Sequence, residues 1–547
     1  MRNHLLYNLL AKWKGFASHY GIVWKNSCLR WDLPENVMGD FALTLALPIS
    51  HKNKKNPSEI AAEIVKLNEY PGLEWTITEQ GYINFRLPFS YYQQFLVQTW
   101  QEKGQNLRGD KKNLRVNLEY VSTNPTGNLH LAHFRHAFLG NALANVYQFC
   151  GYEVVREYYI NDRGGQITSL VNSVYYFYHK LQNISLPNSA NNDYSNKNTE
   201  EIAGKLIKKW GNKYLNVSLD KELFFIWKKE ILKIVLTSIR HDLEKCGVKF
   251  DNWFSETSLY EENKHLSLLQ GLEKKNLICQ QEEATFFRSS WGGDEKDRVI
   301  IKKDGNYTYF FSDILYHLDK LQRSDKIINI WGADHHGFIA RLKSACQLLG
   351  YRAETIQIIL VQIVNLLTPE GDTKKFSKRL GNTISLEETL KYLNLNQLKF
   401  YLLEKEPSQP LAINTELLKE NQEKTRLYYL QYAHARCQQL ISKAQEKNLD
   451  KNSFQIDLLG EKEKKVLNLL IRFPSILEKI TEEDKHHYLI YYLNELANSW
   501  QVYYQNNTIL NEKEPELSSQ KLLVVKNIQI ILKLGLFLLG IEAPERM

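Results

Sequence analysis

Residues 114–133 read LRVNLEYVSTNPTGNLHLAH, and they set the architecture of the middle of the chain. Apolar residues alternate over 114–121, which predicts a β-strand. An Asn-Pro-Thr-Gly turn ends this strand, and apolar residues at helical spacing follow over 130–149. Residues 153–160 then predict a second strand. A strand, a short loop, a helix and a strand form the crossover unit of a parallel nucleotide-binding sheet.

A second unit of this kind lies farther along the chain. Residues 326–331 predict a strand, a loop and a helix follow it, and residues 356–367 are apolar and β-branched enough for one buried strand. From about residue 391 to the end the pattern is helical, which predicts an all-α region. The first hundred residues mix helical stretches with an alternating strand at 81–87, as in a small α/β module.

We therefore predict a multidomain α/β fold, in which a Rossmann-type parallel-sheet domain lies between an N-terminal α/β module and a C-terminal all-α bundle. The predicted boundaries are 1–108 for the N-terminal module, 109–395 for the Rossmann-type domain with an insertion at about 175–265, and 396–547 for the helical domain.

The composition is that of a globular protein, with 547 residues, 43% hydrophobic and 24% charged. A net charge of +8 is compatible with a polyanionic partner such as RNA but does not require one. The six cysteines are scattered without a CxxC pair, so a zinc site built on such a pair is excluded and reduced cytosolic thiols are expected. The apolar stretch 534–541 is far shorter than the roughly 20 residues that span a bilayer.

The first 31 residues contain no acid and several basic residues. That pattern fits either an organelle transit peptide or a basic amphipathic helix, and leucines at helical spacing favour the helix.

A nucleotide site is suggested by the turn after the first strand. Neither a Walker P-loop nor GxGxxG occurs, so a nucleotide would be held in another way. The helix that begins near His130 offers free backbone N–H groups and a positive dipole end, both suited to a triphosphate. His130 and His133 would lie over its first turn and could donate hydrogen bonds to phosphate oxygens. With 15 histidines, chance alone supplies about 0.4 HxxH pairs. The pair is therefore evidence for a nucleotide site only because it lies at the start of a helix, after a predicted strand and turn.

Longer motifs resemble one family along nearly the whole chain. VNLEYVSTNPTGNLHLAH followed by GYEVVREYYINDRGGQI resembles the arginyl-tRNA synthetase form of the class I motif. In the same order come GDFALTLA and GYINFR before it, and then FDNWFSETSL, GDEKDRVIIKKDGNYTYFFSDILYH, WGADHHG, KFSKRLGN, YYLQYAHAR and the terminal APERM. Family members have a short helix directly before the segment that matches 39–42, so the resemblance also favours a structured N-terminal helix.

The resemblance implies an arginine–tRNA ligase. Such an enzyme activates arginine with ATP, accompanied by Mg²⁺, to arginyl-adenylate and transfers it to the 3′-terminal adenosine of tRNA(Arg). We expect no protein-bound zinc or other metal, no membrane, a monomer and a cytoplasmic location. Three rival hypotheses are a non-catalytic RNA-binding protein derived from a synthetase, another nucleotidyltransferase, and a synthetase for a different amino acid.

The resemblance also assigns residues, each of which has an ordinary structural alternative. The guanidinium of arginine would be held by Glu119, Tyr309 and Asp313, since two acids and a ring suit a planar cation. The alternatives are a surface ion pair for Glu119, a core position for Tyr309 and a helix N-cap for Asp313. The remaining assignments are Ser122 and Asn124 near the α-amino and carboxylate groups of arginine; Thr126, Gly127, His130, Ala132, His133, Gly332, Asp334 and His336 (or its neighbour His335) at ATP; Lys375 and Lys378 at the β and γ phosphates; and Tyr429, Gln431, Tyr432 and Arg436 at tRNA.

Two residues depart from the family pattern. Ala132 stands where the family has a glycine that leaves space for adenine, and Phe376 replaces a methionine. The aromatic residues assigned to tRNA have their own alternative, which is packing within the helical bundle.

Overall fold

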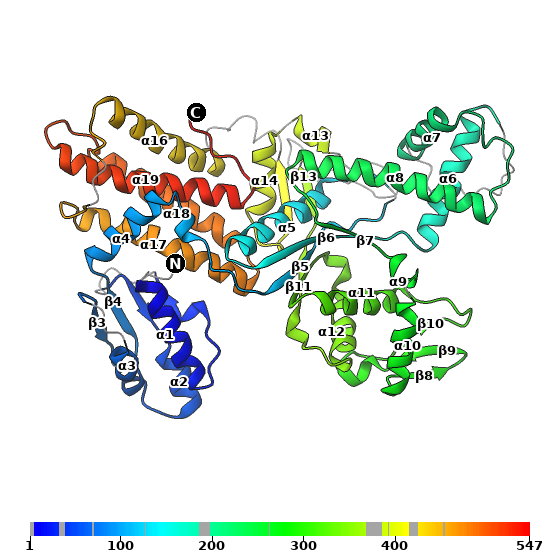
Figure 1. Cartoon of the computed structure of the whole chain (residues 1–547), viewed down its shortest axis with the longest axis horizontal. Coiled ribbons are helices and arrows are strands. Elements are labelled where there is room, and N and C mark those ends of the chain that lie inside the picture. Colours follow the sequence, from blue (N-terminus) through cyan, green and yellow to red (C-terminus); the bar gives the residue numbers. More distant parts are fainter. Residues whose placement is uncertain are drawn as a thin grey trace. The chain divides into compact units, whose positions relative to one another are not determined.

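The structure is a computed structural model that describes residues 5–31, 39–67, 71–125, 127–184, 197–261, 263–367, 386–391, 393–414, 425–451 and 455–547. The chain divides into two compact units (Figure 1). Unit 1 comprises Met1–Lys112, Asn145–Gly151 and Asn421–Met547, and unit 2 comprises Asn113–Ala144 and Tyr152–Glu420.

Unit 2 is built on a five-stranded sheet with the order β12-β11-β5-β6-β7, and every neighbouring pair is parallel. Because the strand order reverses between β5 and β11, a crevice for ligands is expected outside the carboxyl ends of these two strands. The Rossmann-type prediction is confirmed. The strands are β5 (Arg115–Glu119), β6 (Glu153–Ile160), β7 (Asn252–Ser255), β11 (Lys326–Gly332) and β12 (Ile356–Val361).

Helix α5 (Leu131–Phe149) makes the crossover from β5 to β6. Gly140 lies against the ring of Tyr120, and a Cβ on that glycine would overlap the ring. The glycine therefore lets the helix approach the central strand closely. After β11 the chain passes through η4 (Ala333–Phe338), α12 (Ile339–Leu348) and η5 (Ala353–Thr355).

Two insertions separate the strands of this sheet. Between β6 and β7 lies a helical insertion whose core is Trp227, ringed by Tyr178 and Trp210. Its helices are α6 (Gly165–Lys180), α7 (Lys197–Trp210) and α8 (Lys221–Lys245). The second insertion, between β7 and β11, contains α9 (Ser258–Glu261), α10 (Lys264–Lys274), β8 (Ile278–Gln281), β9 (Ala284–Phe287), η3 (Ser289–Gly292), β10 (Arg298–Ile301) and α11 (Tyr309–Arg323).

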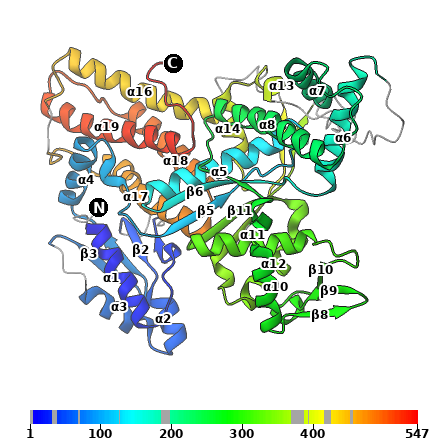
Figure 2. The ribbon, with the colours of Figure 1, turned by 45° about the vertical axis from the view of Figure 1, so that its right-hand side comes forward.

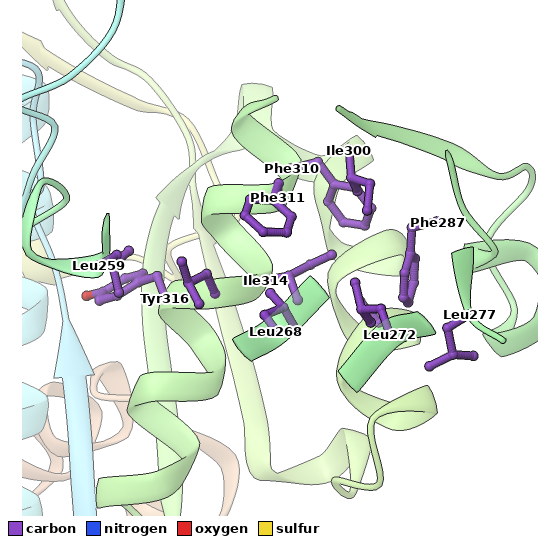
Figure 3. Close-up of a cluster of buried hydrophobic side chains, with 12 residues drawn as sticks. Leu259, Leu268, Leu272, Leu277, Phe287, Ile300, Phe310, Phe311, Ile314 and Tyr316 are labelled. Carbon is purple, nitrogen blue, oxygen red and sulfur yellow. The ribbon is translucent and has the colours of Figure 1, made fainter. Parts of the chain in front are cut away.

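A buried apolar cluster fixes α11 within the second insertion. Phe310, Phe311 and Ile314 pack with Leu272 and Phe287 from α10 and β9 (Figure 3). This packing uses the apolar face of α11, so its polar residues are presented on another face of the same helix.

One strand prediction was wrong. Residues 356–367 form two strands, β12 and β13 (Val364–Leu367), which belong to different sheets. Between them, Gln362 N donates to Pro407 O at 2.9 Å, and β13 pairs in parallel with β14 (Leu411–Asn414). The helical pattern predicted from residue 391 is therefore interrupted by β14, after α13 (Leu386–Leu390) and α14 (Leu395–Leu403).

Unit 1 contains an antiparallel sheet with the order β1-β2-β4-β3. The buried Trp13 of α1 packs on Phe41 and Phe85 from that sheet, so the basic N-terminal stretch forms a packed helix, as favoured from the sequence. The elements are α1 (Leu5–His19), η1 (Asn26–Cys28), β1 (Leu29–Arg30), β2 (Phe41–Leu43), α2 (Ala46–Asn53), α3 (Pro57–Lys66), β3 (Glu74–Ile77), β4 (Ile83–Arg86), α4 (Phe89–Gln101) and η2 (Gln105–Leu107).

The rest of unit 1 is a bundle of long helices (Figure 2). These are α16 (Arg426–Glu446), α17 (Glu461–Glu483), α18 (His487–Asn506) and α19 (Pro515–Leu538). Across the described ranges, none of the helices combines the length and the apolar character that crossing a membrane requires.

Candidate active site

The turn after β5 is strained. Val121 and Ser122 have φ values of 69° and 37°, and Ser122 N donates to Tyr120 O at 3.0 Å, which closes a three-residue turn. Positive φ is unfavourable for a β-branched residue, and such strain persists where the surrounding structure enforces it. Tyr159 N of the neighbouring strand donates to Ser122 Oγ at 3.0 Å and so holds the turn. The chain therefore bends sharply at the carboxyl end of the central strand.

His130 and His133 lie together where α5 begins. Their ring centroids are 3.6 Å apart and the ring planes are inclined by 24°. His130 N donates to Nδ1 of His133 at 3.2 Å, so the neutral ring of His133 has its proton on Nε2. The predicted pairing on one face of the first turn is confirmed.

The loop after β11 approaches these histidines. Burial, together with the charges of Arg135, His130 and His335, lowers the pKa of His136 to about 4, and the charge of Asp334 opposes this fall. Asp334 and His335 are exposed, with 4.0 Å between Oδ2 and Nε2. Gly332 leaves room for this acid, because a Cβ there would lie 2.5 Å from Asp334 Oδ1. The two loops at the switch point thus present histidines and an acid at one sheet edge.

Glu119 ends β5 in a buried network. Lys320 Nζ donates to Glu119 Oε2 at 2.6 Å and to Asn329 Oδ1 at 2.7 Å. His317 Nδ1 donates to Asp313 O at 2.7 Å, so its Nε2 accepts from Asn329 Nδ2 at 2.7 Å. Burial lowers the pKa of His317 to about 3, which keeps the ring neutral. His317, Asn329 and Lys320 therefore form a continuous chain of buried hydrogen bonds that ends at Oε2 of Glu119.

Asp313 lies in a different electrostatic setting. Burial, together with the carboxylates of Glu256 and Glu119, raises its pKa to about 7, and the charge of Arg341 partly opposes this rise. No hydrogen bond to its carboxylate comes from the described residues. A half-buried acid of this kind is stabilised in its charged form by a cationic ligand.

Tyr309 begins α11 one turn before Asp313, so the two side chains lie on one face. Tyr309 is 59% exposed and therefore is not a core residue. The N-cap of the helix is Thr308, whose side chain accepts from Phe311 N, so Asp313 is not a cap. The ion pair of Glu119 is buried rather than on the surface. The three ordinary alternatives thus do not describe these residues.

The other residues that the resemblance assigns to arginine and ATP lie in different surroundings. Asn124 is exposed and its amide contacts that of Asn161 at 3.2 Å, Gly127 has open space around it, and Ala132 is half-buried at the start of α5. His336 is exposed in η4 beside His335. Thr126, Lys375 and Lys378 lie outside the described residues.

Two residues at this edge were not singled out from the sequence. Glu256 follows β7, is 5% exposed, and has a pKa that burial raises while hydrogen bonds from Ser312 and Tyr159 oppose the rise. Lys320 is completely buried seven residues after Asp313. The position of Glu256 after a parallel strand is a signal that could have identified it. Helical spacing places Lys320 on the same face of α11 as Asp313, but it does not show that the lysine is buried.

The residues assigned to tRNA lie on α16 in unit 1. The Arg436 guanidinium carbon lies 4.4 Å from the ring centroid of Tyr432 and 4.6 Å from that of Tyr504, and Nη1 donates to Gln501 Oε1 at 2.9 Å. Tyr429 is 54% exposed. Gln431 Nε2 donates to Glu542 O at 2.9 Å, which ties that side chain to the C-terminal segment. An aromatic and cationic surface is therefore formed without a ligand.

Comparison with known proteins gives three consecutive family matches. Residues 29–87 match the arginyl tRNA synthetase N terminal domain, 92–425 match the catalytic domain of tRNA synthetases class I (R), and 430–547 match the DALR anticodon binding domain. The chain belongs to the arginyl-tRNA synthetase family. Among the relatives, the arginine–tRNA ligase of Listeria monocytogenes is 36% identical over 93% of this chain and 92% of its own length.

Other relatives agree with this membership. The arginine–tRNA ligase of Bacillus subtilis is 34% identical over 93% of this chain and 92% of its own length. The solved structure of Thermus thermophilus arginyl-tRNA synthetase has the same fold, with a TM-score of 0.77 and 21% identity over 99% of this chain and 100% of that one. Within the described residues, no three or more His, Cys, Asp or Glu side chains are grouped as metal ligands would be.

Proposed function

We propose that the enzyme activates arginine with ATP and transfers it to the 3′-terminal adenosine of tRNA(Arg). The observation that carries this proposal is Asp313, a carboxylate without a hydrogen-bond donor among the described residues, in electrostatic reach of Glu119 at the carboxyl end of β5. A guanidinium supplies the positive charge and the paired donors that such a site favours.

The site residues would each have a separate role in binding the substrates. Asp313 and Glu119 bind the guanidinium and Tyr309 covers it, while Ser122 and Asn124 orient the α-amino and carboxylate groups. His130 and His133 donate hydrogen bonds to phosphate oxygens, and Asp334 binds ribose hydroxyls beside Gly332. Thr126, Gly127, Ala132 and His336 complete the ATP site, and Lys375 and Lys378 neutralise the β and γ phosphates.

The reaction then takes two balanced steps. A carboxylate oxygen of arginine attacks the α-phosphorus of ATP, and the bond to the β-phosphate oxygen breaks to release pyrophosphate. A ribose hydroxyl of the terminal tRNA adenosine next attacks the acyl carbon, loses its proton, and releases AMP. Mg²⁺ enters with ATP as part of that substrate. The protein stabilises phosphate charge that grows in the transition state and forms no covalent intermediate.

The wider proposal assigns tRNA contacts to Tyr429, Gln431, Tyr432 and Arg436, where an exposed ring and a stacked guanidinium suit unpaired bases. It also keeps three domains, with boundaries after residues 108 and 395, and an enzyme that acts as a monomer in the cytoplasm.

Charging of purified tRNA(Arg) tests this function. We expect labelled arginine, and neither lysine nor citrulline, to become acid-precipitable with tRNA(Arg). Citrulline is the informative control, because it keeps the shape of arginine without the charge. Asp313→Asn should lower kcat/KM for arginine by about 10²-fold or more, since a buried hydrogen-bonded charge pair is lost. Equal use of citrulline and arginine would contradict the assigned pocket.

A further inference from the structure

A cavity of about 280 Å³ lies within unit 1, and none of the residues assigned to tRNA on α16 lines it. One wall comes from η1, β1 and the residue that follows them, and the other wall comes from α17. The described lining includes Ser27, Arg30, Trp31, Arg472, Ile476 and Lys479, and it includes no carboxylate.

The wall formed by α17 is preorganised. Arg472, Ile476 and Lys479 are spaced by four and three residues, so they share one face of the helix. Both cations are held by α18. Arg472 Nη1 lies 3.1 Å from Glu495 Oε2, and Lys479 Nζ lies 4.3 Å from the ring centroid of Tyr488. Long side chains fixed in this way lose less conformational freedom when they bind a ligand.

The opposite wall supplies an aromatic ring and a third cation. Trp31 packs beside Phe41, with 5.2 Å between ring centroids. Arg30 is exposed and forms no ion pair with any described residue. Asn26 N donates to Glu482 Oε2 at 3.0 Å, so this wall is bonded to α17. Helix α1 is also held to α17, since Lys14 Nζ lies 3.3 Å from Glu478 Oε2. The cavity is therefore a built feature of unit 1.

We propose that this cavity binds one unpaired nucleotide of the tRNA. Arg30 and Lys479 would contact its phosphate, and the base would lie on Trp31 and Ile476. Cationic and aromatic residues together are the chemistry by which proteins hold single-stranded RNA. The volume of about 280 Å³ is just below the roughly 300–1,000 Å³ of ligand pockets, so the ligand must be no larger than one nucleotide. The inference rests on the proposed function, because it takes tRNA to be the substrate.

Charge-matched variants test the proposal. Arg30→Gln/Lys479→Gln removes two charges from the cavity, and Lys462→Gln/Lys465→Gln removes two exposed charges from the same helix outside it. We expect the first variant to raise the Kd for tRNA(Arg) about tenfold in filter binding, and the control to raise it about twofold or less. Trp31→Leu should also raise the Kd about tenfold, and Trp31→Phe should restore most of the affinity, because stacking is retained.

The same variants separate this proposal from the ligase function. At saturating tRNA, all of them should keep the wild-type kcat for charging, since none lies at the assigned active site. Equal Kd values for the cavity variant and its control would overturn the cavity proposal while leaving the ligase function standing. Loss of arginine charging by the wild-type enzyme would instead overturn the ligase function.

A measurement on the wild-type enzyme keeps the test independent of variant folding. With tRNA bound, lysine acetylation followed by mass spectrometry should show Lys479 protected severalfold and Lys462 unchanged. If Lys479 reacts equally with and without tRNA, the proposal fails. Protection of Lys479 by inorganic phosphate but not by tRNA would identify a site for a free anion, which also overturns it.

Discussion

Lys320 Nζ lies 2.6 Å from Oε2 of Glu119, and both side chains are buried. The charge of Glu119 is thus compensated by the protein itself, whereas no described residue donates a hydrogen bond to the carboxylate of Asp313. This difference assigns separate roles to the two acids in the proposed pocket. Asp313 supplies the charge that attracts a guanidinium, and Glu119 supplies a fixed acceptor whose direction Lys320 sets.

Replacing Lys320 by methionine should destabilise the enzyme. The substitution keeps the aliphatic stem but leaves Glu119 buried without its cation. Breaking a buried pair in this way costs about 3–5 kcal/mol. Urea unfolding of unit 2 followed by circular dichroism should show the loss. The double variant Lys320→Met/Glu119→Gln should recover most of it, and equal stability of the single and double variants would contradict the pairing.

Arginine affinity should rise with pH up to about 7. Since the pKa of Asp313 is raised to about 7, the free enzyme holds a proton there at lower pH. Binding a guanidinium needs the carboxylate, so that proton must leave. The logarithm of the association constant should increase by nearly one for each pH unit below 6.5 and level off above 7.5. Calorimetry at pH 6 in two buffers of different ionisation enthalpy should register release of about one proton.

The raised pKa of Asp313 also makes the stability of the folded enzyme depend on pH. In the unfolded chain Asp313 titrates near its ordinary pKa of about 3.9, so the folded state binds more protons between pH 4 and 7. The contribution of Asp313 to stability is therefore lost as pH rises through this window. Asp313→Asn should remove that part of the pH dependence, and an unchanged curve would show that the carboxyl does not titrate there.

His133 should act through Nε2. Its Nδ1 accepts from His130 N, which fixes the proton on the other nitrogen. Removing one preorganised donor to a developing charge typically lowers kcat by about 10²–10³-fold. We expect this loss in His133→Ala with little change in KM for ATP. In His133→Gln the side-chain amide can replace the Nε2 donor, so a partial recovery of kcat is the outcome that supports hydrogen bonding. Equal kcat values for both variants would argue against it.

The sequence predicted the first crossover unit closely because its signals are local. The predicted strand at 153–160 matches β6, and the helix predicted from residue 130 begins at Leu131 in α5. The pairing of β13 with β14 was missed, because the partners are short and lie more than 40 residues apart. A parallel pair has no hairpin turn to reveal it.

In the candidate site, too, local patterns identify some residues and miss others. Turn residues and the HxxH pair could be identified from local pattern, and Asp313 only through the family resemblance. The importance of Lys320 follows from a partner 201 residues earlier in the chain and from complete burial of the ammonium. A lysine in an amphipathic helix is ordinarily solvated, so helical periodicity alone could not single it out.

Gly332→Ala should weaken ATP binding. The added Cβ would lie 2.5 Å from Asp334 Oδ1, so the acid must move from its present position. If Asp334 binds ribose, the loss of one such hydrogen bond raises KM for ATP about tenfold. Initial rates at saturating arginine and tRNA measure this effect. Gly337→Ala is the control, because nothing lies within 4 Å of a Cβ built on that glycine. Equal KM values for ATP in the Gly332→Ala and Gly337→Ala variants would contradict the steric argument.

Arg436→Lys should weaken tRNA binding almost as much as Arg436→Ala. The guanidinium is stacked between Tyr432 and Tyr504 and bonded to Gln501, and this arrangement depends on a planar group. A lysine keeps the charge but cannot stack in the same way. If the surface binds unpaired bases by stacking, both variants should raise KM for tRNA about tenfold, at unchanged kcat. If charge alone mattered, Arg436→Lys would behave as wild type. The salt dependence of the Kd separates the two explanations, because losing one phosphate contact lowers the slope by about 0.7–0.9, whereas losing a stacking contact leaves it nearly unchanged.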